Sequence, residues 1–364
     1  MSPHDAQPAG GDESARPARN GWLLVAGPLI AGAAIVAVLW LLWGAGAEPK
    51  LYRHSPRLLM STDCEITIVL RADQRRLARR ALQQAERALR DVEARMSVYT
   101  QHTELWNLNA APAGRTVPLS PQTLEALRAS RELHAASRGA FDVTVLPLVR
   151  LWKQAGRNGR LPTEAQIAAA RAAATWEQIT LLEDGAVKDS NTACVDLGGI
   201  AKGYAVDRAV EALKGLGVPS GIVNLGGNLR CFGRRADGEP WQVDVRDPFA
   251  PSEDKAMATL HVADAAVCTS AHYHRFSVIG GRRYSHILDP ATGRPTERTA
   301  SVTVVAPTCM QADGWATALS VLGPEGLKLL PNGMEAMLVV GEPATHKTHA
   351  TEGFRKHMAE GPGD

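Results

Sequence analysis

The chain has few aromatic residues, no closely spaced cysteine pair and almost no excess of either charge. Phe, Trp and Tyr together account for 5% of its 364 residues, and the formal net charge is +2. This near-neutral balance gives no support for nucleic-acid binding. The cysteines include no CxxC motif, which argues against a disulfide framework and against a structural zinc site. We expect them to be buried and free, with an unforeseen spatial pair left open; they are Cys64, Cys194, Cys231, Cys268 and Cys309.

Charge is absent altogether from one long stretch near the N-terminus. Residues 21–44 are apolar, with tryptophan near both ends, and they follow a Pro-, Gly- and charge-rich segment, 1–20, that we expect to be disordered. About 20 apolar residues span a bilayer, and tryptophan favours its interface. The stretch therefore predicts a transmembrane anchor with the body of the protein exported. A cleaved signal peptide stays open, because Ala45, Gly46 and Ala47 form an acceptable cleavage site.

Residues 58–341 are expected to form one folded body of class α+β, followed by a polar, frayed tail at 342–364. Apolar residues recur at helical spacing in five segments: 73–96, 120–137, 163–174, 200–213 and 311–322. Short apolar runs between Gly, Pro or Asp turns predict strands at 59–70, 179–182, 193–196, 221–225, 229–232, 241–246, 256–262, 266–269, 275–279, 301–306 and 334–340. Strands and helices do not alternate regularly, so we expect mixed, largely antiparallel sheets with flanking helices.

The most informative segment begins Asp196-Leu-Gly-Gly-Ile-Ala-Lys202-Gly. It places a carboxylate, a Gly–Gly pair and a lysine at a predicted strand-to-helix turn. A helix start exposes unpaired N–H groups and the positive end of the helix dipole, which suit a phosphate. The glycine spacing matches neither the dinucleotide fingerprint nor the P-loop. The segment suggests a phosphorylated ligand held in some other way, and a tight turn with a surface lysine is the alternative.

A second segment, Ala312-Asp313-Gly-Trp-Ala-Thr317-Ala-Leu, carries a carboxylate and a hydroxyl on one helix face, because Asp313 and Thr317 are four residues apart. These groups suit a hard cation such as Mg²⁺, which takes few protein ligands and keeps phosphates and waters. The alternative is that Asp313 merely caps the helix and that Thr317 lies at the edge of the core.

Further candidates lie at predicted turns. His286 precedes the turn Asp289-Pro-Ala-Thr-Gly293, where a histidine can act as a general base or can simply anchor the turn. Two small-residue loops, Asn224-Leu-Gly-Gly-Asn and Thr269-Ser270, would let backbone approach a ligand closely or serve only as hairpin turns. His272 and His274 have no partner at a spacing typical of a metal site.

Together these segments resemble the ApbE-type family of FAD:protein FMN transferases, over residues from about Met60 to about Val340. The order of the motifs carries the resemblance. They are Met60-Ser-Thr, Met96-Ser-Val-Tyr99, Glu104-Leu…Leu108-Asn, Gly139-Ala-Phe-Asp-Val-Thr, Asp196-Leu-Gly-Gly-Ile-Ala-Lys-Gly, Asn224-Leu-Gly-Gly-Asn, Thr269-Ser, His286-Ile-Leu-Asp-Pro-x-Thr-Gly and Ala312-Asp-x-x-Ala-Thr-Ala-Leu.

The resemblance implies an exported, Mg²⁺-dependent enzyme that takes FMN from FAD, joins it by a phosphoester to a threonine or serine of a target protein and releases AMP. It implies that Asp313, Thr317 and the carbonyl of Gly199 bind magnesium and that His286 is the base for the target hydroxyl. The residues implied to contact FAD, the flavin substrate, are Met60, Phe141, Asp142, Asp196, Lys202 and Ile287.

The implied setting is the bacterial inner membrane, with one N-terminal anchor and the catalytic body in the periplasm. The implied partner is an acceptor subunit of a membrane electron-transfer complex. Ser61 and Ala271 stand where the family commonly has glycine, which puts in doubt how closely the flavin lies on the Met60 strand and how a loop lies at the acceptor side. An FAD pyrophosphatase and a non-enzymatic FAD-binding assembly protein remain the alternative functions.

Overall fold

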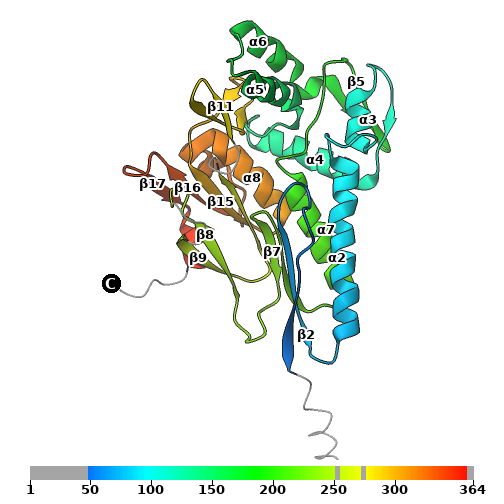
Figure 1. Cartoon of the computed structure of the whole chain (residues 1–364), viewed down its shortest axis with the longest axis vertical. Coiled ribbons are helices and arrows are strands. Elements are labelled where there is room, and N and C mark those ends of the chain that lie inside the picture. Colours follow the sequence, from blue (N-terminus) through cyan, green and yellow to red (C-terminus); the bar gives the residue numbers. More distant parts are fainter. Residues whose placement is uncertain (1–47, 251–254, 272–275, 359–364) are drawn as a thin grey trace, which may run out of the picture. The chain divides into compact units, whose positions relative to one another are not determined.

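The computed structural model describes residues 48–250, 255–271 and 276–358 (Figure 1). The chain divides into two compact units, 1–48 and 49–364, and nearly all of the described residues belong to the second unit. The tail expected at 1–20 and the apolar stretch at 21–44 lie outside the described residues. None of the helices in the described ranges is long and apolar enough to cross a membrane.

An eight-stranded sheet forms the centre of the body, and every neighbouring pair of strands in it is antiparallel. The sheet confirms the predicted α+β class with antiparallel pairing. In spatial order its strands are β1 (Pro49–His54), β2 (Cys64–Arg71), β6 (Ser220–Leu225), β7 (Asn228–Phe232), β10 (Ala266–Ala271), β15 (Ser301–Ala306), β16 (Glu335–Val340) and β17 (Lys347–Ala350).

Both faces of the central part of this sheet are covered, so inner strands such as β2 and β15 are apolar at successive positions rather than at alternate ones. One face packs on the helices α2 (Arg75–Met96), α7 (Ala201–Gly215) and α8 (Cys309–Leu322), which lie together on one side of the sheet (Figure 1). The other face packs on the hairpin β8 (Trp241–Arg246) and β9 (Ala256–Val262) and on Phe354. In β15 all six residues are buried, with Val304 facing the helices and Val305 facing the hairpin.

A second layer of smaller elements lies beyond the helices. It contains α3 (Glu104–Ala110), α4 (Pro121–Ala136) and a small sheet of β3 (Val117–Pro118), β4 (Ile179–Leu181) and β5 (Gly185–Lys188). A separate apolar cluster, which includes Leu148, Trp152, Ile167 and Leu288, joins α5 (Leu146–Asn158) and α6 (Glu164–Ala173) to the hairpin β11 (Phe276–Ile279) and β12 (Arg282–Ser285). The short pair β13 (Leu288–Asp289) and β14 (Arg294–Pro295) follows, and 3₁₀ turns occur at Val143–Val145, Trp176–Gln178 and Gly323–Leu329.

Four segments differ from the sequence expectation. The sheet already includes β1 at Pro49–His54, before residue 58, where the folded body was expected to begin. Residues 193–196 do not form a strand, since the backbone of Val195 is paired to the side chain of Asn109 and not to a neighbouring strand. The strand expected from residue 59 begins at Cys64, because residues 59–62 close a tight turn. The expected frayed tail contains β17 and the helix α9 (Glu352–His357), and its Phe354 is fully buried against the sheet.

All five cysteines are free and buried, as expected. Two of them are close in space: the Sγ atoms of Cys268 in β10 and Cys309 at the start of α8 are 3.4 Å apart. Burial raises the pKa of both thiols, so neither is a ready nucleophile in the folded protein.

Candidate active site

The site is centred on Asp313, a carboxylate that is only 2% exposed where α8 crosses α7. Its Oδ2 accepts a hydrogen bond from the backbone N–H of Gly203 at 3.0 Å, and the Nζ of Lys202 lies 3.4 Å from Oδ1. A buried carboxylate needs such partners, because an isolated charge in the interior is strongly unfavourable. The helix cap of α8 is Thr308, so the reading of Asp313 as a cap is wrong.

Gly203 explains how α7 and α8 come so close. A Cβ atom on Gly203 would lie 2.2 Å from the carbonyl oxygen of Cys309 and 2.8 Å from the Cβ of Asp313. Any side chain there would push the two helices apart. The glycine is thus required to place Lys202 and the Gly203 amide against Asp313.

Asp207, one turn further along α7, fixes the start of α8. Its two carboxylate oxygens accept hydrogen bonds from the amides of Cys309 and Met310 at 2.9 and 2.8 Å, and Arg230 donates to it at 2.8 Å. Burial raises the pKa of this carboxyl, whereas the two amides and Arg230 favour its ionised form. The register between α7 and α8 is therefore held at two successive turns, by Gly203 and by Asp207.

Thr317 lies one turn beyond Asp313 on α8 and faces the Gly198–Gly199 turn. A Cβ on Gly199 would lie 3.3 Å from the Oγ1 of Thr317 and 3.2 Å from the ring of Phe141. The structure thus brings Gly199, Thr317 and Phe141 together, next to the helical turn that carries Asp313. A carboxylate, a hydroxyl and a nearby backbone segment form an oxygen-rich group of the kind that holds Mg²⁺.

The Asp196 loop is held by contacts from distant parts of the chain. The amide of Asp196 donates to the carbonyl of Val143 at 2.7 Å, and the side chain of Asn109 makes two 2.8 Å hydrogen bonds to the backbone of Val195. The Oδ1 of Asp196 accepts from the amide of Gly198 at 2.9 Å. Burial raises the pKa of Asp196, and Lys153 and Arg150 oppose that shift electrostatically.

The helix start after Gly199 differs from the expected cradle of free N–H groups. The amides of Ile200 and Ala201 donate to the carbonyl of Leu197, and that of Gly203 donates to Asp313. Because these donors are already used, the positive character of the turn comes mainly from Lys202. Its side chain is 20% exposed and paired with Asp313, so it is not a free surface lysine.

Met60 lies at the tip of a strained two-residue turn. The φ angles of Met60 and Ser61 are +48° and +61°, a region that non-glycine residues seldom adopt. The Met60 amide donates to the Oε1 of Glu93 at 2.9 Å. The adjacent Thr62 packs on the Asn224–Gly227 loop so closely that a Cβ on Gly226 would lie 2.1 Å from its Oγ1. Two of the sequence motifs thus meet, and the positive φ explains why glycine would suit position 61.

The Phe141–Asp142 segment lies beside Ile287 through its neighbour Ala140. Ile287 packs with Ala140 and with Val321 of α8, and the Nδ1 of His134 lies 3.1 Å from the carbonyl oxygen of Phe141. Asp142 accepts hydrogen bonds from the amide and hydroxyl of Thr144 at 2.8 and 2.7 Å. Burial raises the pKa of Asp142, against the effect of Thr144 and of the nearby His134.

His286 is exposed, between the end of β12 and the start of β13. It directly precedes Ile287 in the chain. Of the two loops, Asn224–Asn228 joins the Met60 turn, whereas Thr269 pairs with Thr303 within the sheet. His272 and His274 lie outside the described residues.

Four residues of this framework were not singled out from the sequence as site residues: Glu93, Asn109, His134 and Asp207. Glu93, Asn109 and Asp207 act on segments far away in the chain, and no local pattern marks such a role. His134 acts on the nearby Phe141 and Asp142. Within the described ranges, no group of three or more His, Cys, Asp or Glu side chains could hold a metal. A metal bound at this site would have one carboxylate ligand, Asp313, and its other ligands would be neutral oxygen atoms.

Comparison with known proteins identifies the class of this site. The model of the ApbE family matches residues 60–338. FAD:protein FMN transferase of Vibrio cholerae is 33% identical over 335 residues, which cover 90% of this chain and 99% of that protein. The enzyme of the same name from Escherichia coli K12 is 30% identical over 272 residues, covering 72% of this chain and 77% of that protein.

Solved structures agree with the sequence comparisons. Flavinyl transferase ApbE of Pseudomonas stutzeri superposes with a TM-score of 0.75 at 32% identity, covering 86% of this chain and 98% of that one. The ApbE protein of Thermotoga maritima gives a TM-score of 0.76 at 27% identity, covering 85% of this chain and 100% of that one. Fold and site thus define an enzyme of the transferase class. The chain belongs to the ApbE family.

Proposed function

We propose that the protein is a Mg²⁺-dependent FAD:protein FMN transferase. It would move FMN from FAD to a threonine or serine hydroxyl of a target protein through a phosphoester bond and release AMP. The observation that carries the proposal is the α7–α8 junction, where the buried Asp313 faces Lys202 and Gly203 and where Thr317 lies against Gly199. The names of the relatives supply the reaction.

The donor set suits magnesium. Asp313, Thr317 and the carbonyl of Gly199 offer only hard oxygen atoms and one negative charge, which leaves positions for waters and phosphate oxygens. Asp313 makes one short hydrogen bond and a long contact to Lys202, so carboxylate lone pairs remain for a cation. Magnesium bound there would neutralise negative charge on the diphosphate as its P–O bond breaks.

The protein's own groups have separate tasks in this reaction. Met60, Phe141, Asp142, Asp196 and Ile287 bind and orient FAD, and Lys202 provides positive charge beside the diphosphate. His286 accepts the proton of the acceptor hydroxyl. The hydroxyl oxygen then bonds to the phosphorus of the FMN half, the bond from that phosphorus to the bridging oxygen breaks, and the bridging oxygen leaves with AMP.

The experiment uses the full-length chain with FAD, Mg²⁺ and a candidate acceptor domain carrying a threonine. After denaturing electrophoresis, flavin fluorescence on the acceptor band together with AMP release is the expected result. AMP and free FMN without a labelled band, for every acceptor domain tried, would contradict transfer and favour FAD hydrolysis. FAD binding without any AMP would favour a non-enzymatic binding protein.

We also propose that residues 21–44 anchor the enzyme in the bacterial inner membrane with its body in the periplasm, beside an acceptor subunit of an electron-transfer complex. The uncharged apolar stretch with flanking tryptophans supports this proposal. Membrane fractions washed with carbonate should retain the protein, and protease added to spheroplasts should digest it. Recovery in the wash, or protection from the protease, would contradict the anchored, exported arrangement.

A further inference from the structure

Two of the buried cysteines touch each other next to the α7–α8 junction. Cys268 lies in β10, and Cys309 is the first residue of α8, 41 positions further along the chain. Their Sγ atoms are 3.4 Å apart, and the Cys268 thiol also lies 3.5 Å from the carbonyl oxygen of Cys309. Of the five cysteines, all of which are among the described residues, only these two make a sulfur–sulfur contact. The two thiols are therefore close enough to react with each other.

The sheet fixes the direction of the Cys268 side chain. Cys268 pairs with Val304 in β15 and with Asn228 in β7, so β10 is held along both of its edges. Cys268 and Cys309 belong to the apolar cluster on the helix face of the sheet, whereas Cys231 belongs to the cluster on the opposite face. The sheet itself therefore keeps Cys231 away from the pair, although β7 and β10 are neighbours.

Cys309 is held from the other side by α7. Its amide donates to Asp207 at 2.9 Å, and its carbonyl oxygen lies so close to α7 that a Cβ on Gly203 would be 2.2 Å away. The sulfur atoms of a disulfide are about 2.05 Å apart, so a bond between Cys268 and Cys309 requires them to approach by about 1.4 Å. Rotation of the two side chains supplies a movement of this size without any shift of β10 or α8.

We propose that Cys268 and Cys309 form a disulfide when the chain folds in the presence of an external disulfide, and that this bond locks the start of α8 onto the sheet. Cys309 lies at a helix N-terminus, which favours a thiolate while α8 is still solvated. Its sulfur attacks the external disulfide, forms a mixed disulfide and releases one thiolate. The sulfur of Cys268 then attacks that of Cys309 and releases the second thiolate. The pair loses two electrons and two protons, and the external disulfide gains them.

Burial determines when this exchange takes place. Both cysteines are 0% exposed, so an external disulfide cannot reach their sulfur atoms in the folded protein. The bond therefore forms before α8 packs on β10, and once formed it is shielded from external thiols. A chain that folds reduced stays reduced, and a chain that folds oxidised stays oxidised.

The bond would also act on the segment between the two cysteines, which carries His286, Ile287 and β15. A disulfide that closes a long loop restricts the unfolded chain and so stabilises the folded one. The inference goes beyond the proposed transfer function and does not rest on it, because the bond concerns the framework around Asp313 and requires neither FAD nor Mg²⁺. The proposed periplasmic location would supply an oxidant of the required class.

The test starts from the full-length chain, reduced and unfolded in urea with a mild detergent. The chain is refolded by dilution, either into a mixture of reduced and oxidised glutathione or into dithiothreitol. After acid quenching and denaturation, free thiols are blocked with N-ethylmaleimide and counted by intact mass. Trypsin leaves the two cysteines in separate peptides, 256–275 and 299–328, so a bond between them appears as one linked species.

We expect refolding with dithiothreitol to leave all five thiols free and refolding with glutathione to leave two fewer, with the two peptides linked. The matched control Cys231→Ala removes another buried cysteine and should form the same linked species, whereas Cys268→Ala should not. Equal thiol counts under the two conditions would overturn the inference, and so would a link between any other two cysteines.

The proposed lock is tested by stability. Oxidised wild type should unfold at a urea concentration about 1 M higher than reduced wild type, and Cys268→Ala should unfold at the same concentration after either refolding. An oxidised form no more stable than the reduced one would contradict the lock. Oxidised glutathione added to protein that has already folded reduced should leave all five thiols free. Oxidation of the folded protein as fast as during refolding would refute the proposed order of events.

None of these measurements needs turnover. A wild type that forms the bond but releases no AMP from FAD refutes only the proposed function. A wild type that releases AMP and labels the acceptor without ever forming the bond refutes only the inference about Cys268 and Cys309.

Discussion

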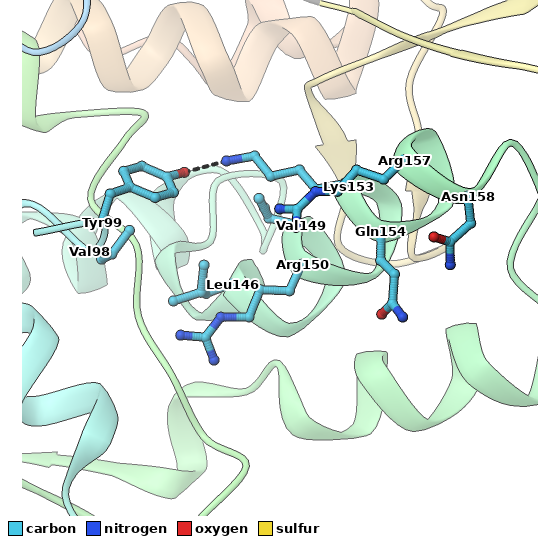
Figure 2. A pocket seen from close by; sticks show the side chains of 9 residues that line it. All are labelled: Val98, Tyr99, Leu146, Val149, Arg150, Lys153, Gln154, Arg157 and Asn158. Atoms are coloured by element: carbon cyan, nitrogen blue, oxygen red, sulfur yellow. Dashed lines mark hydrogen bonds between the residues drawn. The ribbon is translucent and has the colours of Figure 1, made fainter.

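The α7–α8 junction and one side of α5 both carry charged side chains. These charges differ in their burial and in their partners. At the junction, Asp313 is buried and meets Lys202 and a backbone amide. Along α5, Arg150, Lys153 and Arg157 line an open hollow (Figure 2), and none of them forms an ion pair within the described ranges. The charge of Asp313 is thus fixed by burial and by its partners, whereas the three cations along α5 stay solvated.

The sharpest way to break this comparison is Asp313→Asn. The substitution keeps the shape and removes the negative charge, so we expect AMP release to fall about 100-fold or more. The measurement is AMP formation from FAD over a range of Mg²⁺ concentrations. Full activity at saturating Mg²⁺ would refute the metal assignment, and the exposed substitution Asp73→Asn serves as the control.

The rigidity of the junction is tested by Gly203→Ala. The new Cβ would lie 2.2 Å from the carbonyl oxygen of Cys309, so we expect the free energy of unfolding to fall by about 3 kcal/mol. Urea unfolding followed by circular dichroism measures it. Gly215→Ala, in the same helix with nothing within 4 Å, should instead raise stability by about 0.5 kcal/mol. Equal effects of the two substitutions would contradict the close helix contact.

These substitutions also show how far the sequence could lead. The apolar spacing of α7 and α8 was visible in it, and so was the four-residue spacing of Asp313 and Thr317. That Gly203 lets the helices touch, and that Asp207 accepts hydrogen bonds from the first amides of α8, could not be predicted because the contacts join residues about 100 positions apart. The same holds for residues 193–196, where Asn109 replaces the neighbouring strand that local pattern suggested.

Strands were predicted well where burial leaves a clear apolar pattern, which is continuous in β15 and alternating in β8. The runs in β8, β9 and β15 were predicted to the residue. β17 was missed because Lys347–Ala350 is polar and joins the sheet only through pairing with β16. The grouping of Arg150, Lys153 and Arg157 was missed for another reason. These residues are separated in the sequence, and they come to lie on one side only because α5 is helical.

A smaller effect is expected from Thr317→Val, which replaces the hydroxyl by a methyl group of similar size. Its loss should raise the Mg²⁺ concentration for half-maximal AMP release about tenfold and leave the maximal rate nearly unchanged. The comparison is with Thr303→Val in β15, whose hydroxyl pairs within the sheet. An unchanged Mg²⁺ requirement in the Thr317 variant would remove this residue from the metal site.

The smallest expected effect is that of Asp196 on how stability changes with pH. Burial raises the pKa of this carboxyl above its usual value of 3.8, so the folded state favours the protonated form. Its contribution to stability is therefore full below pH 3.8 and is lost as pH rises through the higher, folded-state pKa. Asp196→Asn keeps an oxygen acceptor for the Gly198 amide and removes the charge. In urea unfolding between pH 4 and 7, the variant should lose less stability than wild type; equal losses would contradict this assignment.

The central claim is that the α7–α8 junction supports transfer of FMN to a hydroxyl of another protein. The most direct measurement is the intact mass of a candidate acceptor domain after incubation with the full-length enzyme, FAD and Mg²⁺, with peptide mapping of any adduct. The account predicts a gain of one FMN less one water on a threonine or serine, with wild type and not with Asp313→Asn. An acceptor labelled equally by both enzymes would contradict it, and so would AMP release that leaves every tested acceptor unmodified.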